Sequence, residues 1–223
     1  MTVILYELRG KKDVRFSPYC WRSRMALQHK CINAEYEPVL FSQKEKIRFS
    51  KQTLVPILQD GNQVITDSWN IACYLEKEYP EKPTLFGDKY AQSLTKQFNL
   101  WMDISIHPLL AKCIMADVLE YVVADRDKEY FRKSREKRFG VSIEKYSTRS
   151  VEDIENLHHG LKSISVTLKN QPYIAGESPS YADYILFGSY KFALLTSPRN
   201  IFPADGPIMD WANRISNLFI KEL

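Results

Sequence analysis

The alternation of strand-like and helix-like segments in the first third of the chain most constrains its fold. Residues 2–8 are a short run of β-branched, aromatic and leucine residues, which is typical of a strand. Residues 17–30 have a helical pattern, with Ser17 as the N-cap before a proline at the first helical position. A second strand is predicted over 34–41, and Pro38 favours an edge position for it. The chain therefore begins with a β-α-β unit.

A hairpin and a helix follow this unit. Two strand-like segments, 54–60 and 63–68, flank a Gly-Asn dipeptide, which is typical of a tight hairpin turn. The helical period returns at 68–79, with Ser68 as the predicted N-cap. The short segment between the second strand and the hairpin predicts no definite element. The order βαβ-ββα indicates a small α/β domain.

The rest of the chain predicts helices only. Residues 83–88 contain proline and glycine and are expected to link an α/β domain over 1–82 to an all-helical domain over 89–223. Helical apolar spacing runs over 89–125, and a kink or break is expected at His107-Pro108. Further helices are predicted over 150–170, 180–195 and 206–221.

Composition predicts a globular protein that remains in the cytoplasm. The 223 residues are 44% hydrophobic and 26% charged, which is ordinary for such a protein. There is no run of about 18 uncharged apolar residues, so no membrane span is expected, and the first residues do not resemble a secretory signal. The four cysteines show neither paired nor metal-ligand spacing, which favours reduced thiols.

The net charge of +4 is mild, and its densest cluster is residues 128–138. Glu129 with Lys133, and Arg132 with Glu136, have the spacing of ion pairs on one helix. The cluster is therefore interpreted as a solvated helix face, and no nucleic-acid partner is expected.

Three features of the first domain together predict a ligand site. Ser17 caps a helix directly after the first strand, among free backbone N–H groups at the positive end of the helix dipole. Val55-Pro56 begins a strand; we expect this bond to be cis, presenting the N–H and C=O of Val55 to an extended peptide. Asp67 and Ser68 precede a second helix, where N–H groups can hold a carboxylate. Glutathione has the thiol, the peptide backbone and the free amino-acid end that such a site requires.

The same segments resemble a known family. The N-terminal half resembles the thioredoxin-like domain of cytosolic glutathione S-transferases, and GESPSYADYILFG resembles the N-capping box of their helical domain, formed here by Ser180 and Asp183. Three segments, RFSPYCWRSRMALQHK, ITDSWNIACYLEKEYP and YFRKSREKRFG, are similar to bacterial β-etherases of lignin catabolism and to fungal etherase-type transferases. The resemblance implies the glutathione transferase architecture and a homodimer.

The resemblance also implies roles for single residues. Ser17 holds the glutathione thiolate, which attacks an electrophilic carbon, while Asp67 meets the amino group and Ser68 the carboxylate of the γ-glutamyl end. The acceptor is expected between the domains near Trp21 and Trp101 and to be aromatic, with β-aryl ether cleavage as one candidate reaction. The sequence does not choose among the residues that could meet the glycyl carboxylate, which are Gln43, Lys44, Lys46, Lys51 and Gln52.

Other interpretations of these residues stay open. Ser17 could be only a helix cap, and Cys20 could be the nucleophile of a thiol–disulfide enzyme. On a helix, Cys20, Leu27 and Cys31 share one face, which favours Cys20 as a core residue.

A non-catalytic carrier of glutathione or hydrophobic ligands is a further alternative. Ser180 and Asp183 are expected to be structural. The adjacent histidines at 158 and 159 point in different directions on a helix, so no metal is expected.

Overall fold

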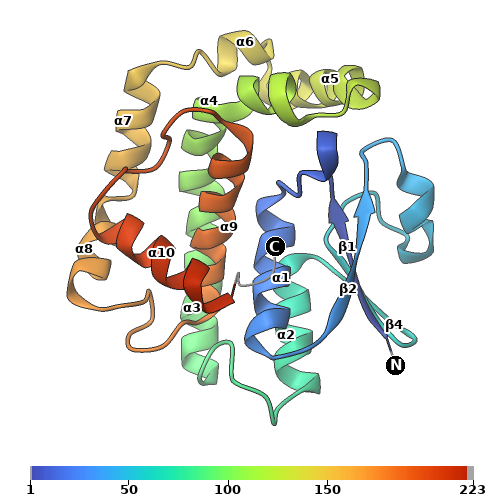
Figure 1. Cartoon of the computed structure of the whole chain (residues 1–223), viewed down its shortest axis with the longest axis vertical. Helices are drawn as coiled ribbons and strands as arrows, with labels where there is room; N and C mark the ends of the chain where they lie inside the picture. The colour runs from blue at the N-terminus through green and yellow to red at the C-terminus, as the bar shows by residue number, and fades with distance from the viewer. Residues whose placement is uncertain (1, 220–223) are drawn as a thin grey trace.

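The computed structural model describes residues 2–219, and its first part is a four-stranded mixed sheet (Figure 1). The sheet has the order β2-β1-β3-β4, with β1 parallel to β2 and antiparallel to β3, and β3 antiparallel to β4. The predicted edge position of the strand that carries Pro38 is confirmed. The strands are β1 (Val3–Leu8), β2 (Ala34–Val39), β3 (Ile57–Asp60) and β4 (Gln63–Thr66).

Helices α1 (Pro18–His29) and α2 (Ser68–Glu78) lie on the side of the sheet that faces the helical part of the chain (Figure 1). Leu5 and Leu58 point to this side and are fully buried in the main core. The short 3-10 helix η2 (Lys44–Ser50) covers the other face, where its Ile47 packs with Ile57. Because successive side chains of a strand point to opposite faces, β1 and β3 contribute to one apolar layer on each face of the sheet. A second 3-10 turn, η1 (Lys11–Asp13), follows β1.

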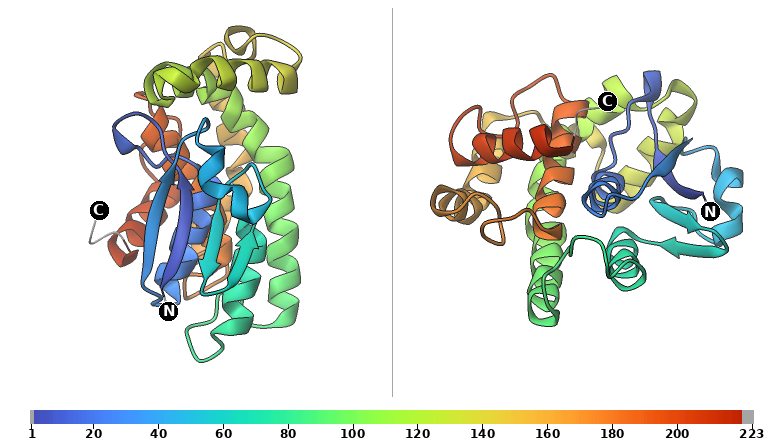
Figure 2. Two further views of the ribbon diagram at one scale, coloured as in Figure 1. Left: turned by 90° about the vertical axis from the view of Figure 1, so that its right-hand side faces the viewer. Right: turned by 60° about the horizontal axis from the view of Figure 1, so that its bottom comes forward.

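One long helical run opens the second part (Figure 2, left). It consists of α3 (Lys89–Trp101), the π-helical η3 (Met102–Ile106), α4 (His107–Asp117) and the π-helical η4 (Val118–Val122). A kink or break is expected at His107-Pro108 from the sequence, but the helical run continues through this pair without a break. Instead a π-helical turn directly precedes this pair, and Pro108 lies in the first turn of α4, where its missing N–H is tolerated.

The remaining helices surround this run (Figure 1). In the part of the chain that the structure describes, no strand beyond residue 90 joins the sheet. The predicted last helix includes positions 220 and 221, which lie outside the described residues. No helix within 2–219 is both long and apolar enough to cross a membrane. The elements are η5 (Asp125–Asp127), α5 (Lys128–Phe139), α6 (Ile143–Tyr146), α7 (Val151–Gly160), α8 (Lys162–Asn170), α9 (Tyr181–Thr196) and α10 (Pro207–Phe219).

Helix α9 fastens the two parts together by packing along α1 (Figure 1). At its N-terminus, the buried Asp183 carboxylate accepts hydrogen bonds from the Ser180 N–H at 2.9 Å and the Trp211 indole at 2.9 Å, and the capping box is present. The buried Tyr181 hydroxyl donates to the Ser68 carbonyl at 2.8 Å. The start of α9 therefore holds the start of α2 in place.

Candidate functional site

Ser17 lies at the N-terminal end of α1, immediately after the loop from β1. Its hydroxyl oxygen accepts a hydrogen bond from the Cys20 backbone N–H at 3.3 Å, so Ser17 is the N-cap. The side chain is 6% exposed. Because the oxygen accepts from the helix, its own proton is available to an incoming anion, and the remaining N–H groups of the first turn add positive potential.

Cys20 lies in the core beneath this turn. It is 2% exposed, its sulfur accepts from the Leu8 N–H at 3.5 Å, and burial raises the pKa of its thiol to about 12. A thiol with such a pKa is not a thiolate at neutral pH. Cys31, expected on the same packed face, is instead exposed, because α1 ends at His29 and the chain turns there with φ 50° at Cys31.

Asp67 and Ser68 occupy the start of α2, but their capping roles differ from those predicted. The Asp67 carboxylate accepts from the N–H groups of Trp69 at 3.0 Å and Asn70 at 3.2 Å, which makes Asp67 the N-cap. The prediction of Ser68 as N-cap is therefore wrong by one residue, and Ser68 is the buried first residue of the helix. Asp67 has φ 74° and ψ 133°, a strained backbone for a residue with a side chain, and such strain is concentrated at functional sites.

The sheet register brings these residues to one end of the sheet. The Val55–Pro56 bond is cis, and Pro56 directly precedes β3. Because β1 and β3 are antiparallel with Tyr6 opposite Ile57, the end of β1 that leads to Ser17 adjoins the start of β3. Thr66 also pairs with Ile57, so Asp67 follows β4 at the same end.

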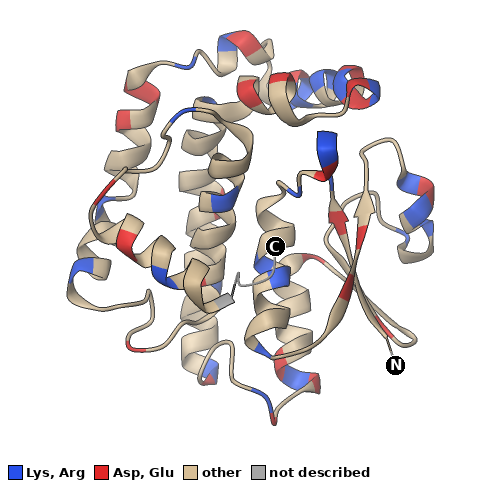
Figure 3. Cartoon of the chain, viewed as in Figure 1, with Lys and Arg blue, Asp and Glu red and all other residues tan. Residues whose placement is uncertain are grey.

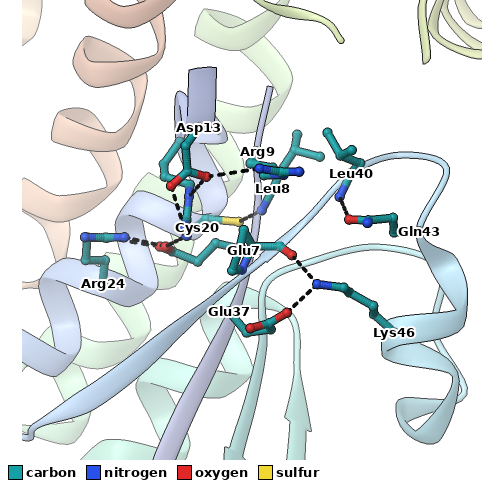
Figure 4. A network of polar contacts seen from close by, with 12 residues as sticks. Glu7, Leu8, Arg9, Asp13, Cys20, Arg24, Glu37, Leu40, Gln43 and Lys46 are labelled. Atoms are coloured by element: carbon teal, nitrogen blue, oxygen red, sulfur yellow. Dashed lines mark hydrogen bonds and ion pairs between the residues drawn. The ribbon is translucent and has the colours of Figure 1, made fainter. Parts of the chain in front are cut away.

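A buried carboxylate fixes the loop between β1 and Ser17 (Figure 4). Glu7 is 1% exposed and accepts from the Arg24 Nε at 3.1 Å and from Arg15 Nη1 at 3.0 Å. Arg15 also pairs with Asp13 at 2.9 Å. Buried charges need such partners, and these pairs tie the strand, the loop and α1 to one another. These ion pairs therefore hold in place the loop that leads to Ser17.

Three of the five residues considered for the glycyl carboxylate already have partners. Lys46 pairs with Glu37 at 2.5 Å and the Gln43 side chain accepts from the Leu40 N–H at 3.2 Å (Figure 4). Lys44 donates to the Tyr130 hydroxyl at 2.9 Å. The other two, Lys51 and Gln52, are exposed beyond η2.

The two tryptophans expected near the acceptor do not lie together beside Ser17. Trp21 is 4% exposed; its indole donates to the Arg15 carbonyl at 2.7 Å and its ring meets the edge of Phe187. Trp101 lines a different hollow, a cavity of about 260 Å³ between α3 and α8. Trp21 supports the site from the core between the domains, whereas Trp101 belongs to the far side of the long helix.

Instead, a group of phenylalanine and tyrosine rings includes Phe16, the residue before Ser17. The Phe16 and Phe41 ring centroids are 6.3 Å apart, and Phe41 lies 5.6 Å from Phe131 and 6.0 Å from Tyr130. Sequence reasoning missed this group because its members come from three separate segments. Phe131 and Tyr130 looked like ordinary residues of the helix that carries the basic cluster.

A polar network joins the first turn of α1 to the long helix. The Tyr19 hydroxyl lies 3.3 Å from His107 Nδ1, Arg22 pairs with Asp103 at 2.8 Å, and His107 Nε2 lies 2.7 Å from the Ser189 hydroxyl. Burial, followed by the charge of Arg22, lowers the pKa of His107 to about 3. Tyr19 itself is 37% exposed.

The histidine pair at the end of α7 forms no metal site. His158 lies 2.9 Å from the Ile201 carbonyl, and His159 is exposed. Across the described residues, no cluster of histidine, cysteine and acidic residues could hold a metal ion.

Known proteins match the chain over both of its parts. A model of the glutathione S-transferase N-terminal domain matches residues 13–83, and a model of the C-terminal domain of the same family matches residues 93–211. A zeta-class glutathione S-transferase of Euphorbia esula is 32% identical over 53% of this chain and 55% of its own length. Glutathione S-transferase omega-1 of Mus musculus is 25% identical over 78% of this chain and 62% of its own.

Solved structures share the whole fold. Glutathione transferase GSTFuA3 from Phanerochaete chrysosporium superposes with a TM-score of 0.88 at 21% identity, covering 100% of this chain and 99% of that one. A glutathione S-transferase of Ceriporiopsis subvermispora, solved in complex with glutathione, has a TM-score of 0.84 at 21% identity, covering 100% and 98%. The chain spans about half the length of the first curated relatives it matches. Since the family models together cover most of the sequence, the chain belongs to the glutathione S-transferase family.

Proposed function

We propose that this protein is a glutathione transferase that uses Ser17 to stabilise the glutathione thiolate. The observation that carries the proposal is the contrast in the first turn of α1. There a serine hydroxyl caps the helix, while Cys20 is buried with its pKa raised to about 12 by burial. Free thiols ionise near a pKa of about 8.5, so a hydroxyl donor and helix-end N–H groups increase the thiolate fraction.

Glutathione is proposed to lie along the end of the sheet where Val55, Asp67 and Ser68 meet. Val55 next to Pro56 would pair with the cysteinyl backbone, and the start of α2 would hold the γ-glutamyl end. The structural neighbour from Ceriporiopsis subvermispora binds glutathione, which supports this ligand. In this proposal residues 1–82 bind glutathione, 83–88 form the linker, and 89–223 contribute the acceptor pocket.

The reaction follows from the thiolate. Its sulfur donates an electron pair to an electrophilic carbon of the acceptor, so a C–S bond forms as the bond to the leaving group breaks. The leaving group departs with that electron pair and takes a proton from solvent if it is basic. The half-buried Phe41 ring and the exposed Tyr130 ring, which lie beside Phe16, suit an aromatic acceptor. Cleavage of β-aryl ethers is the finer proposal, supported by the resemblance of three sequence segments to etherases.

Two alternatives give different results in the same assays. A non-catalytic carrier would bind glutathione and turn over no electrophile. A thiol–disulfide enzyme would require Cys20 as its nucleophile, and its burial disfavours that role.

We also propose a cytoplasmic homodimer, as the family resemblance implies. An exposed apolar stripe on α3 and η3 supports self-association, because Tyr90 is 84%, Leu94 72% and Ile104 71% exposed at helical spacing. Isolated exposed apolar residues are common, but a stripe along one helix face is typical of an interface.

The test is turnover and thiolate absorbance against pH for Ser17→Ala and Cys20→Ala. Losing one hydrogen bond to a charged group costs about 1.5–3 kcal/mol, so Ser17→Ala should raise the pKa of bound glutathione. Turnover should fall roughly 10- to 150-fold where the thiolate step limits the rate. Affinity for glutathione should change little, because Val55, Asp67 and Ser68 remain. Loss of activity in Cys20→Ala with retention in Ser17→Ala would refute the proposal.

A further inference from the structure

Helix α5 is attached to the rest of the molecule by few apolar side chains. Phe131 is its only buried residue, and charged side chains are spread along its length (Figure 3). Glu129 pairs with Lys133 at 2.6 Å and Arg132 with Glu136 at 3.1 Å, as their spacing predicts. Because these two ion pairs lie within the helix, they do not fix it to the body of the protein.

The start of α5 is fastened to the loop that follows β2. The buried Asp127 carboxylate accepts a hydrogen bond from the Ser42 N–H at 3.1 Å, and Arg126 donates to the Ser42 hydroxyl at 2.8 Å. Phe131 packs against Phe41 of the same loop, with ring centroids 5.6 Å apart. Neighbouring polar and apolar contacts therefore hold α5 against this loop.

These elements lie beyond the end of β1, over the segment that leads from β1 to Ser17 (Figures 1 and 2, left). Lys11 of that segment pairs with Asp125 of η5 at 2.8 Å. The ring of Phe16, at the end of the segment, is 6.3 Å from that of Phe41. Phe16 is 3% exposed and Ser17 6% exposed. In this conformation the segment before the serine is therefore covered.

The contact with Ser42 leaves Asp127 incompletely paired. Its Oδ1 accepts the hydrogen bond from Ser42, but its buried Oδ2 has no hydrogen-bond partner among the described residues, which is costly for a carboxylate. Asp127 is also the residue before α5, yet its side chain makes no cap hydrogen bond. If α5 moves away from Ser42, the same carboxylate can turn and cap the free N–H groups of the helix. The carboxylate thus has partners in two arrangements.

The two ends of α5 allow it to move as a unit. The short 3-10 turn η5 precedes it, and Gly140 ends it with φ 73°, a conformation that glycine adopts without strain. We propose that η5 and α5 form a movable cover over the segment that leads to Ser17, and that an aromatic acceptor reaches the thiolate when this cover lifts. The acceptor ring then takes the place of Phe41 against Phe16. The proposal rests on the transferase function and adds the route of the acceptor.

If the cover moves as one body, weakening one of its contacts frees the other. Phe131→Leu removes the ring contact with Phe41 but leaves the hydrogen bond of the Ser42 N–H intact. We expect hydrogen exchange of the Ser42 N–H, followed by NMR on the ligand-free protein, to become about 10-fold faster in this variant. Phe139→Leu is the matched control, because Phe139 belongs to the same helix but stacks on Tyr146 at 3.7 Å. It should leave exchange at Ser42 unchanged.

Asp127→Ser weakens the closed arrangement by a second route. A serine still caps a helix, but it lacks the carboxylate that accepts from the Ser42 N–H. Because the binding-competent fraction rises, KM for chlorodinitrobenzene should fall about 10-fold. Iodoacetamide, a small electrophile without a ring, should keep its KM. Glu129→Gln changes an exposed acid that pairs only along the helix, and as the control it should alter neither value.

Ligands separate this inference from the proposed function. S-(dinitrophenyl)glutathione should speed exchange at Ser42 in the wild type, whereas S-methylglutathione, which has no ring, should not. The cover is overturned by unchanged exchange at Ser42 in Phe131→Leu, by an equal change in Phe139→Leu, by an unchanged KM in Asp127→Ser, or by an equal response to both ligands. No binding of either glutathione derivative and no turnover would refute the transferase, while exchange at Ser42 in the free variants would still show whether the cover moves.

Discussion

At the scale of residues, burial decides the protonation of the groups around the site. Cys20 and His107 are both held in their neutral forms, since burial raises the pKa of the thiol to about 12 and lowers that of the imidazole to about 3. His29, which is half-buried against the helical part, has its pKa lowered by burial in the same way. The polar network that joins α1 to the long helix therefore contains Arg22 and Asp103 as its charged pair and a neutral histidine.

The buried histidine predicts acid sensitivity. An unfolded histidine titrates near a pKa of about 6.5, so below that pH the unfolded chain binds a proton that folded His107 does not. Stability is then fully present above about pH 6.5 and is lost as pH falls toward 3, by about 2 kcal/mol at pH 5 for this group. Denaturant unfolding from pH 8 to 5 should show a flatter pH dependence for His107→Asn. The exposed His159→Asn is the control, and an equal effect in both variants would contradict this assignment.

At the scale of elements, close approach of α9 to α1 sets the position of Ser17. A Cβ at Gly188 would lie 2.4 Å from the Pro18 carbonyl oxygen, a backbone atom of the first turn of α1. The helix pair can pack at this separation only because position 188 lacks a side chain. The residue next to Ser17 in sequence is thus fixed by a glycine far along the chain.

We expect Gly188→Ala to lower stability by about 1–3 kcal/mol, the usual range for overpacking a filled core, and to lower turnover by displacing Ser17. Gly160→Ala in α7 is a matched control, because a Cβ there would meet only side-chain methyl groups of Leu109 and Ile106 at 3.0 and 3.1 Å. Urea denaturation and turnover measured on both variants check this. Unchanged stability in Gly188→Ala would mean that α1 can shift freely.

At the scale of the whole molecule, the loops at the Ser17 end of the sheet are tied to the start of α5. The buried Asp127 carboxylate accepts from the Ser42 N–H at 3.1 Å, Arg126 donates to the Ser42 hydroxyl at 2.8 Å, and Lys11 pairs with Asp125 at 2.8 Å. These contacts hold the start of α5 against the loops that follow β1 and β2. On α3, the apolar side chains of Tyr90 and Leu94 are left exposed.

If these side chains belong to the dimer interface, Leu94→Glu should give a monomer, because a buried unpaired charge costs several kcal/mol. Leu194→Glu places the same change at a position of α9 that is 55% exposed, against 72% for Leu94, and should leave the dimer intact. Light scattering during size-exclusion chromatography measures the mass of each variant. A wild-type monomer, or a dimer that survives Leu94→Glu, would contradict the proposed interface.

The sequence by itself determined those features that depend only on residues close together along the chain. The strand at residues 3–8, the Ser17 cap, the hairpin and the capping box of Ser180 with Asp183 each follow from local backbone chemistry and spacing. So does the ion pair of Glu129 with Lys133, because both residues belong to one helix. The predicted N-cap of α2, Ser68, is wrong by one residue. The cap is Asp67, which adopts a strained positive φ that the local pattern does not reveal.

Only the tertiary structure decided which side chains share a space. Trp21 and Trp101 have similar chemistry, yet one is buried against Phe187 and the other lines a hollow against α8. Phe41 and Arg135 meet beside Phe16 although about a hundred residues separate them along the chain. The direction of a side chain across a domain interface depends on how helices cross and which atoms can approach, and a linear pattern carries no record of that.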